Sequence, residues 1–209
     1  MNSLNKPNPV LLIHGIFDTI GIFDQMSRYL KNLGWDVYSL NLVPNYGILG
    51  LDKLAKQVDD YISKTFPPNQ PLDLIGFSMG GIVSRYYVQR LGGIDRVKRF
   101  ITISSPHNGT LTAYALNLAA PKQMRPKSDF LEDLNQDIAL LEKINFTSIW
   151  TPYDAMILPA ISSQVPVGRD IKINVLLHAW MVSDEKVLKV IVEELKAEYK
   201  SRKTIDFIG

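Results

Sequence analysis

Six short apolar runs, separated by amphipathic stretches, constrain the fold of this chain more than any other feature. The runs are four to seven residues long, rich in branched side chains, and cover residues 10–13, 37–42, 72–77, 99–104, 146–150 and 171–177. Between them, apolar residues recur at helical spacing over residues 23–33, 51–66, 79–91, 129–144 and 183–199. Parallel strands need a long crossover between them, usually a helix. The alternation therefore predicts an α/β fold with about six parallel strands and helices on both faces.

The length and composition of the chain fit one such unit. It has 209 residues, of which 46% are hydrophobic and 21% are charged, the balance of an ordinary globular protein. It contains no internal repeat, low-complexity tract or linker that would divide it. We therefore expect residues 1–209 to form a single domain, and we expect a monomer.

The composition also excludes several classes of site and partner. The chain has no cysteine, which rules out disulfides, thiolate metal sites and cysteine nucleophiles. The net charge is +2 without a dense run of Lys and Arg, so we expect no nucleic-acid partner. No segment approaches the roughly 20 apolar residues of a membrane span. The polar N-terminus has no apolar stretch long enough for a signal peptide, which predicts a cytoplasmic protein and leaves secretion open.

A G-x-S-x-G motif, Gly76-Phe77-Ser78-Met79-Gly80, joins the third apolar run to a helical pattern. Small residues on both sides of a serine permit a sharp turn from strand to helix, which exposes the hydroxyl at the edge of the sheet. The helix N-terminus also directs free amides and a positive dipole end toward that hydroxyl. A serine that only caps the helix is the alternative. The strand before the motif and the helix after it favour a nucleophile, Ser78.

A serine nucleophile needs a general base, and the chain has three histidines. When this motif supplies the nucleophile, the acid and then the histidine follow it along the chain. His14 precedes Ser78 and is excluded by that order. His178 follows the sixth apolar run and is the predicted base. His107 follows the fourth run, too early for the usual order, and we expect it to be a polar loop residue near the site.

The acid partner should lie between Ser78 and His178, at the carboxyl end of a strand. Asp154 follows the fifth apolar run and meets both conditions. It would hold the imidazole in the correct tautomer and stabilise the imidazolium. The alternative for Asp154 is an aspartate that forms a turn after a proline. The aspartates within residues 129–144 fall on a solvated helix face, and Asp170 precedes the last strand at the opposite end of the sheet.

Two backbone N–H groups should stabilise the oxyanion of the tetrahedral intermediate. Met79, immediately after the serine, would supply one. The second would come from the loop after the first strand, where Gly15 allows the chain to turn back toward Ser78. The N–H of Ile16 is the predicted donor, and that of Phe17 is the alternative.

Residues 106–128 interrupt the alternation of strands and helices. They hold a small apolar stretch, three prolines and three Lys or Arg residues. A connection of this length inside a compact domain is usually functional or mobile. We expect a short loop excursion over the carboxyl edge of the sheet, where such folds place their sites. An ordinary surface helix with a basic loop is an equal alternative.

Three segments of the chain resemble small bacterial lipases related to the Bacillus lipase A group and class 2 triacylglycerol lipases. They are the first strand with His14-Gly15, residues 76–81, and residues 105–110. The resemblance implies the α/β-hydrolase fold, no metal or other cofactor, and hydrolysis of acylglycerols or simpler fatty esters. It also implies an oxyanion hole at the positions of Ile16 and Met79. Some members of the Bacillus group have alanine where this chain has the first glycine of the motif.

The residues expected around the nucleophile are apolar, which suits an acyl chain because each buried methylene contributes about 0.8 kcal/mol. The predicted substrate-binding residues are Phe17, Leu111, Tyr114, Met156, Ile157 and Trp180. The alternative for many of these is packing beneath loops as satellite core residues. We expect an acyl-ester or lipid substrate and transient contact with a lipid interface.

The sequence therefore predicts a carboxylester hydrolase, a lipase or esterase, that acts through Ser78, Asp154 and His178 and an acyl-enzyme intermediate. An acyl-thioesterase or amide hydrolase using the same triad is the first alternative. A non-catalytic binding protein of this fold is the second. The presence of all three residues argues against the second alternative, since binding alone would not require them.

Overall fold

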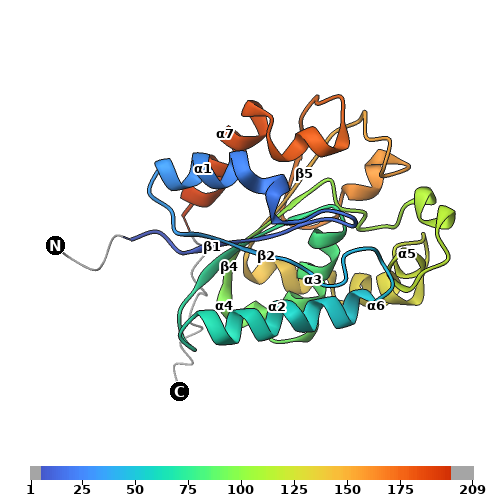
Figure 1. Cartoon of the computed structure of the whole chain (residues 1–209), viewed down its shortest axis with the longest axis horizontal. Helices are drawn as coiled ribbons and strands as arrows, with labels where there is room; N and C mark the ends of the chain where they lie inside the picture. Colours follow the sequence, from blue (N-terminus) through green and yellow to red (C-terminus); the bar gives the residue numbers. More distant parts are fainter. Residues whose placement is uncertain (1–5, 199–209) are drawn as a thin grey trace, which may run out of the picture.

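The computed structural model describes residues 6–198, which form a single parallel sheet with helices on both faces (Figure 1). The six strands are β1 (Val10–Ile13), β2 (Val37–Leu40), β3 (Leu72–Phe77), β4 (Val97–Ile103), β5 (Asn145–Trp150) and β6 (Arg169–Lys172). Their order in the sheet is β2-β1-β3-β4-β5-β6, and every neighbouring pair is parallel. The predicted α/β-hydrolase fold is confirmed.

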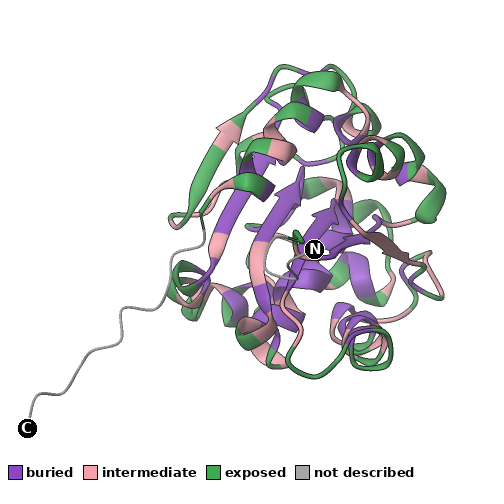
Figure 2. Ribbon diagram, turned by 90° about the vertical axis from the view of Figure 1, so that its left-hand side faces the viewer, coloured by how far each residue is buried: buried purple, intermediate pink, exposed green. Residues whose placement is uncertain are grey.

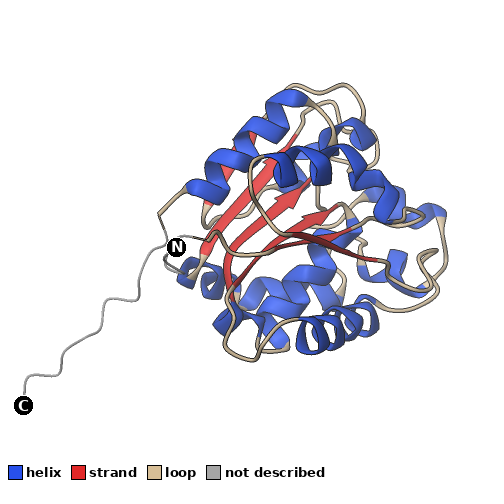
Figure 3. Ribbon diagram, turned by 60° about the vertical axis from the view of Figure 1, so that its left-hand side comes forward, coloured by secondary structure: helices blue, strands red, loops and turns tan. Residues whose placement is uncertain are grey.

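The helices form two layers that enclose the sheet, as Figure 3 shows. They are α1 (Asp24–Asn32), α2 (Leu51–Thr65), α3 (Met79–Arg90), α4 (Gly93–Arg96), α5 (Ala119–Gln123), α6 (Asp129–Gln136) and α7 (Glu185–Lys196). Helices α1 and α7 cover one face of the sheet, and α2, α3 and α6 cover the other. Short 3-10 helices occupy several loops, namely η2 (Ile20–Phe23), η3 (Leu111–Ala115), η4 (Ile138–Lys143), η5 (Ala160–Ser163) and η6 (His178–Val182). Among residues 6–198, no helix combines the length and the apolar composition that crossing a membrane requires.

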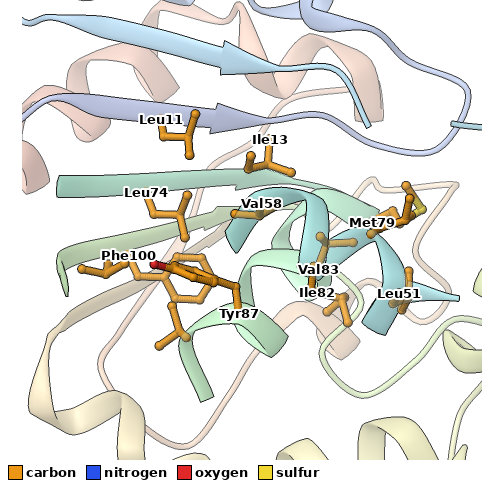
Figure 4. Close-up of a cluster of buried hydrophobic side chains, with 14 of the residues drawn as sticks. Leu11, Ile13, Leu51, Val58, Leu74, Met79, Ile82, Val83, Tyr87 and Phe100 are labelled. Atoms are coloured by element: carbon orange, nitrogen blue, oxygen red, sulfur yellow. The ribbon is translucent and has the colours of Figure 1, made fainter. Parts of the chain in front are cut away.

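The core is divided by the sheet into two apolar layers. In β1, Val10 and Leu12 face the layer under α1 and α7, whereas Leu11 and Ile13 face the layer under α2 and α3. This division follows from the two-residue period of a strand. The central strands are buried on both faces (Figure 2). Figure 4 shows Val83 and Tyr87 of α3 in the second layer.

The strand order places a topological switch point between β1 and β3. The chain leaves β1 toward α1 on one face of the sheet and leaves β3 toward α3 on the other face. The two connections therefore diverge, and they open a crevice at the carboxyl edge of the sheet. The loop of His14 and Gly15 and the turn at Ser78 border this crevice.

The last strand ends earlier than predicted. The apolar run over residues 171–177 predicts a strand, but β6 ends at Lys172 because its neighbour β5 ends at Trp150. After Lys172 the chain remains next to the segment that follows β5, because the Thr151 hydroxyl donates to the Val175 carbonyl at 2.7 Å. The run is therefore extended but is only partly a strand.

The helix predicted over residues 129–144 is divided in two. Helix α6 ends at Gln136, and a 3-10 helix, η4, follows it. Two side chains of α3 account for the break: Arg85 Nη2 donates to the Leu134 carbonyl at 2.7 Å, and Gln89 Nε2 donates to the same carbonyl at 2.9 Å. Gln89 Nε2 also donates to the Asp137 carbonyl at 3.0 Å. These bonds satisfy carbonyls at the end of α6.

The final helix begins at Glu185, two residues after the start of its predicted range. The Asp184 carboxylate accepts the backbone N–H of Lys186 at 2.8 Å and caps α7. The helix ends at Lys196, whereas the predicted end, Tyr199, lies outside the described residues.

Candidate active site

Ser78 occupies the turn between β3 and α3 in a backbone conformation that serine rarely adopts. Its φ is 53° and its ψ is −125°, and such strain persists only where the surroundings enforce it. The Ser78 N–H donates to the Ile103 carbonyl at 2.8 Å, and the Ser78 carbonyl accepts the Gly81 N–H at 3.0 Å. The turn is therefore attached to β4 as well as to its own helix.

Gly80 of the motif and the following Gly81 allow two close approaches. A Cβ at Gly80 would lie 2.2 Å from the Ile13 carbonyl oxygen, so β1 passes directly against the start of α3. A Cβ at Gly81 would lie 1.9 Å from Ser105 Oγ. Side chains at these positions would push α3 away from the sheet and displace Ser78.

His178 and Asp154 form a hydrogen-bonded pair on the same edge of the sheet. His178 Nδ1 lies 2.7 Å from Asp154 Oδ2 and 3.0 Å from Oδ1. Because the carboxylate accepts the Nδ1 proton, Nε2 is left free of a proton in the neutral ring. The His178 ring also packs against Phe77, with ring centroids 4.8 Å apart. Since Phe77 precedes Ser78, this contact holds the imidazole beside the serine turn.

The Asp154 carboxylate stays ionised despite its burial. Burial alone would raise the pKa of Asp154, but the hydrogen bond to His178, the charge of His178, and the N–H groups of Ile157 and Met156 together bring that pKa below its ordinary value. Both N–H groups donate to Oδ1 at 2.9 Å. The pair therefore consists of a fixed anion and an imidazole whose orientation it controls.

The other two histidines are buried and form hydrogen bonds within the fold. His14 is buried, its Nδ1 lies 2.8 Å from the Gly15 carbonyl, and its Nε2 accepts the Leu42 N–H at 2.9 Å. His107 lies in the loop after β4, as expected, next to the cavity-lining Pro106, but its side chain is fully buried. Its Nε2 lies 2.9 Å from the Thr102 hydroxyl of β4, which draws the ring into the core. Burial lowers the pKa of both histidines.

Backbone amides of two loops border the serine. A Cβ at Gly15 would lie 3.1 Å from Ser78 Cβ, so the loop after β1 touches the nucleophile turn. The Phe17 N–H donates to the Asn45 carbonyl at 2.8 Å. That bond occupies Phe17 and favours Ile16 as the oxyanion donor of this loop. Met79 is the first residue of α3, so its N–H has no acceptor within the helix.

A cavity of about 210 Å³ opens beside Ser78. Its wall includes Phe17, Met156 and Ile157, three of the predicted substrate-binding residues. The remaining lining residues are Ile16, Ser78, Pro106, Thr110, Thr112, Ala113, Ala115, Leu116, Pro121 and Met124. Residues 106–128 thus lie over the carboxyl edge, as the first of their two interpretations expects.

The other three predicted substrate-binding residues do not line this cavity. Leu111, Tyr114 and Trp180 are each more than half exposed. The guanidinium carbon of Arg125 lies 4.8 Å from the centroid of the Tyr114 ring, which holds that side chain against the surface of the excursion. Small residues of the excursion line the cavity instead.

One carboxylate beside the site has no counterpart in the sequence prediction. Asp18 Oδ2 would lie 2.8 Å from a Cβ at Gly15, on the loop that also approaches Ser78. Asp18 lies three residues after Gly15 in the sequence, but the prediction from the order of residues after Ser78 did not consider it. Within the described part of the chain, no group of three or more His, Cys, Asp or Glu side chains could hold a metal ion.

Sequence comparison identifies one family. The sequence profile described as palmitoyl protein thioesterase matches residues 9–128, which include β1, the G-x-S-x-G motif and the excursion. The match covers more than half of the chain.

Solved structures of hydrolases have the same fold. A mature lipase of Bacillus licheniformis superposes with a TM-score of 0.73 at 14% identity, over 91% of this chain and 92% of that chain. Lipase B of Aspergillus fumigatus gives 0.74 at 17%, over 94% of this chain and 54% of its own. An extracellular α/β-hydrolase from a Paenibacillus species gives 0.67 at 19%, over 91% and 100%. At these identities the likeness establishes the fold.

Proposed function

Because this chain belongs to the palmitoyl protein thioesterase family, we propose that it hydrolyses fatty-acyl esters through Ser78. The observation that carries the proposal is the Asp154–His178 pair beside the strained serine turn. A serine hydroxyl is a weak nucleophile alone, and an imidazole fixed by a carboxylate is the base that activates it.

The proposed reaction passes through an acyl-enzyme. His178 Nε2 takes the Ser78 proton as Oγ attacks the ester carbonyl carbon. The N–H groups of Ile16 and Met79 stabilise the resulting oxyanion. As the intermediate collapses, His178 gives the proton to the departing alcohol oxygen, and the acyl group remains on Ser78. Water then attacks the acyl-enzyme with the same base, releasing the fatty acid and restoring the serine.

The cavity beside Ser78 fits the acyl part of such a substrate. Its wall is mostly apolar, so burying methylenes there is favourable. Octanoyl esters, whose acyl chain is of medium length, are therefore suitable test substrates.

Exposed apolar side chains in the connections that follow the strands support access to lipid substrates. Among residues 6–198, fifteen of the sixteen exposed large hydrophobic residues follow the carboxyl ends of strands. We call this set the apolar collar; it comprises Phe17, Ile20, Val43, Tyr46, Ile48, Leu111, Tyr114, Leu116, Tyr153, Met156, Leu158, Ile161, Leu176, Leu177 and Trp180. Large exposed apolar surfaces mark interaction sites, and we propose that the collar contacts the surface of a lipid aggregate.

Acyl thioesters are a second candidate substrate class. The family description itself names a thioesterase. The same nucleophile, base and oxyanion donors would cleave a thioester, with a thiol as the leaving group. Matched octanoyl esters and thioesters of one alcohol–thiol pair separate the two classes by their kcat/KM values.

Labelling by a fluorophosphonate tests the proposed nucleophile. We expect the native protein to be labelled at neutral pH and Ser78→Ala to lose both labelling and about 10⁶-fold of kcat. Ser84→Ala is the matched control, because this buried serine of α3 has no hydrogen-bond partner for its hydroxyl among the described residues. Undiminished labelling of Ser78→Ala, or no labelling of the native protein, would overturn the proposal.

A further inference from the structure

Asp18 places a second carboxylate next to the proposed nucleophile. Asp18 Oδ2 and Ser78 Cβ both lie beside Gly15, at 2.8 Å and 3.1 Å from the position that a Cβ there would occupy. The Asp18 carboxylate also accepts a hydrogen bond from the Gly15 backbone, and Asn45 Nδ2 donates to the Asp18 carbonyl at 2.6 Å. The loop after β1 therefore holds this carboxylate close to Ser78.

The charge of Asp18 is not neutralised by a cation. Among the described residues, no Lys or Arg forms an ion pair with it. Burial raises its pKa, while the charges of His14 and His178 and the bond from Gly15 oppose that rise. Asp154, in contrast, is bonded directly to His178. The Asp18 carboxylate is thus half-buried beside the site and, among the described residues, has no Lys or Arg to balance its charge.

The position of Asp18 indicates that it lies near the leaving group of the substrate rather than the acyl chain. The acyl chain would fill the cavity, whose wall includes Ser78 but neither Asp18 nor His178. His178 must reach the departing oxygen to protonate it, so the leaving group lies on the side of His178. Asp18 Oδ2 lies beside Gly15, whose backbone touches the serine turn, and Asp18 is outside the cavity wall. Asp18 therefore borders the region that the leaving group occupies.

We propose that Asp18 is a specificity-determining residue that selects substrates by the charge of the leaving group. Its carboxylate favours leaving groups that are cationic, disfavours those that are anionic, and leaves neutral alcohols between the two. Charges a few ångströms apart in a partly water-excluded site interact strongly enough to produce such a preference. The inference rests on the proposed hydrolase function and defines the substrate class of the same site.

Three matched octanoyl esters test this preference. Their alcohols are meta-hydroxybenzoate, meta-hydroxybenzamide and a meta-trimethylammonio phenol, which carry a negative, zero and positive charge. The measured quantity is the ratio of kcat/KM for the cationic ester to that for the anionic ester. We expect Asp18→Asn to lower this ratio about tenfold. Comparing variants cancels the intrinsic reactivity of each ester.

Asp60→Asn is the matched control, because it removes the same charge from an exposed position on α2. It should leave the ratio unchanged. The native protein gives an independent readout, since added salt should reduce its ratio by screening. This measurement needs no variant and stands even if Asp18→Asn does not fold.

Each outcome has a distinct meaning. If Asp18 only shapes the loop, Asp18→Asn will lower kcat/KM for all three esters by the same factor, and the inference is wrong. A native ratio that does not respond to salt would also overturn it. Failure of the proposed function is recognised separately, because the native protein would then hydrolyse none of the esters and would not react with the fluorophosphonate.

Discussion

Charged side chains have different partners at the two edges of the sheet. At the amino edge, charged side chains pair across neighbouring elements: Arg99 lies 3.2 Å from the buried Asp73, and Arg169 is paired with the buried Glu194. At the carboxyl edge, the Asp154 carboxylate binds an imidazole, Asp18 lies beside the serine turn, and the residues of the apolar collar lie in the connections that follow the strands.

The difference indicates a division of roles between the edges. Paired charges at the amino edge connect strands and helices, so removing one partner leaves a buried charge and costs stability. At the carboxyl edge, backbone N–H groups hold the Asp154 carboxylate, and its bond to His178 leaves Nε2 of that ring free to act as a base. We therefore expect substitutions at the carboxyl edge to lower activity and substitutions at the amino edge to lower stability.

After the loss of the nucleophile itself, the largest effect is expected at Asp154. Asp154→Asn should lower kcat about 10⁴-fold, because an amide no longer holds the tautomer of His178 that leaves Nε2 as a base. Steady-state hydrolysis of an octanoyl ester measures the loss. Asp36→Asn, which removes an exposed carboxylate paired with Lys6 at the amino edge, should leave kcat within about twofold. Equal losses from the two variants would contradict the division.

The converse effect is expected at Asp73. Asp73→Ala should lower the free energy of unfolding by about 3 kcal/mol, because Arg99 and Asn8 lose their shared acceptor. Urea denaturation measures the change, and kcat should stay near the native value. An Asp73→Ala variant with native stability but reduced kcat would contradict the proposed division of roles between the two edges.

Acidification is expected to destabilise the protein through two neutral histidines. Burial lowers the pKa of His107, with a further contribution from the charge of Arg85, and burial also lowers the pKa of His14. In the unfolded chain both rings take up a proton below about pH 6.5. The stabilisation is therefore complete above that pH and declines below it, by up to about 1.4 kcal/mol per pH unit for each histidine until the pH reaches the pKa of that histidine in the folded protein.

Urea midpoints between about pH 6.5 and 5 measure this decline. His107→Gln should reduce the slope by the share of one histidine. A slope unchanged by that substitution would assign the acid sensitivity to other groups.

The smallest effect is expected in the collar. Leu176→Gln should weaken binding to phospholipid vesicles about tenfold, because one large apolar side chain no longer enters the lipid. Leu33→Gln is the matched control, since Leu33 is exposed at the end of α1, outside the collar. Sedimentation of vesicles with bound protein measures both. Equal weakening of vesicle binding by the two variants would show that the carboxyl edge is not the surface that contacts lipid.

The sequence predicted the strands and the candidate catalytic residues because both depend on local pattern and chain order. Buried parallel strands are continuous apolar runs, and the turn at Ser78 requires glycines that only a few sites in a chain carry. His178 and Asp154 followed from their order after the serine. The structure brings these two side chains together, as that order implies.

The parts that were not predicted depend on contacts between distant segments. The break after Gln136 arises from Arg85 and Gln89 of another helix, which no local pattern reveals. Large apolar residues predicted only part of the cavity wall: Ala113 and Ala115 line the rest because small side chains leave space, while Tyr114 between them is exposed. A search for small residues in the excursion would have found that wall.

The bond from the Ser78 amide to Ile103 has a consequence for how this scaffold can change. The hydroxyl is anchored to the middle of the sheet rather than to the loops that meet the substrate. Those loops can be exchanged, shortened or grafted from another protein while the serine keeps its place. Redesign of substrate preference in this chain should therefore begin with residues 106–128 and leave the strands untouched.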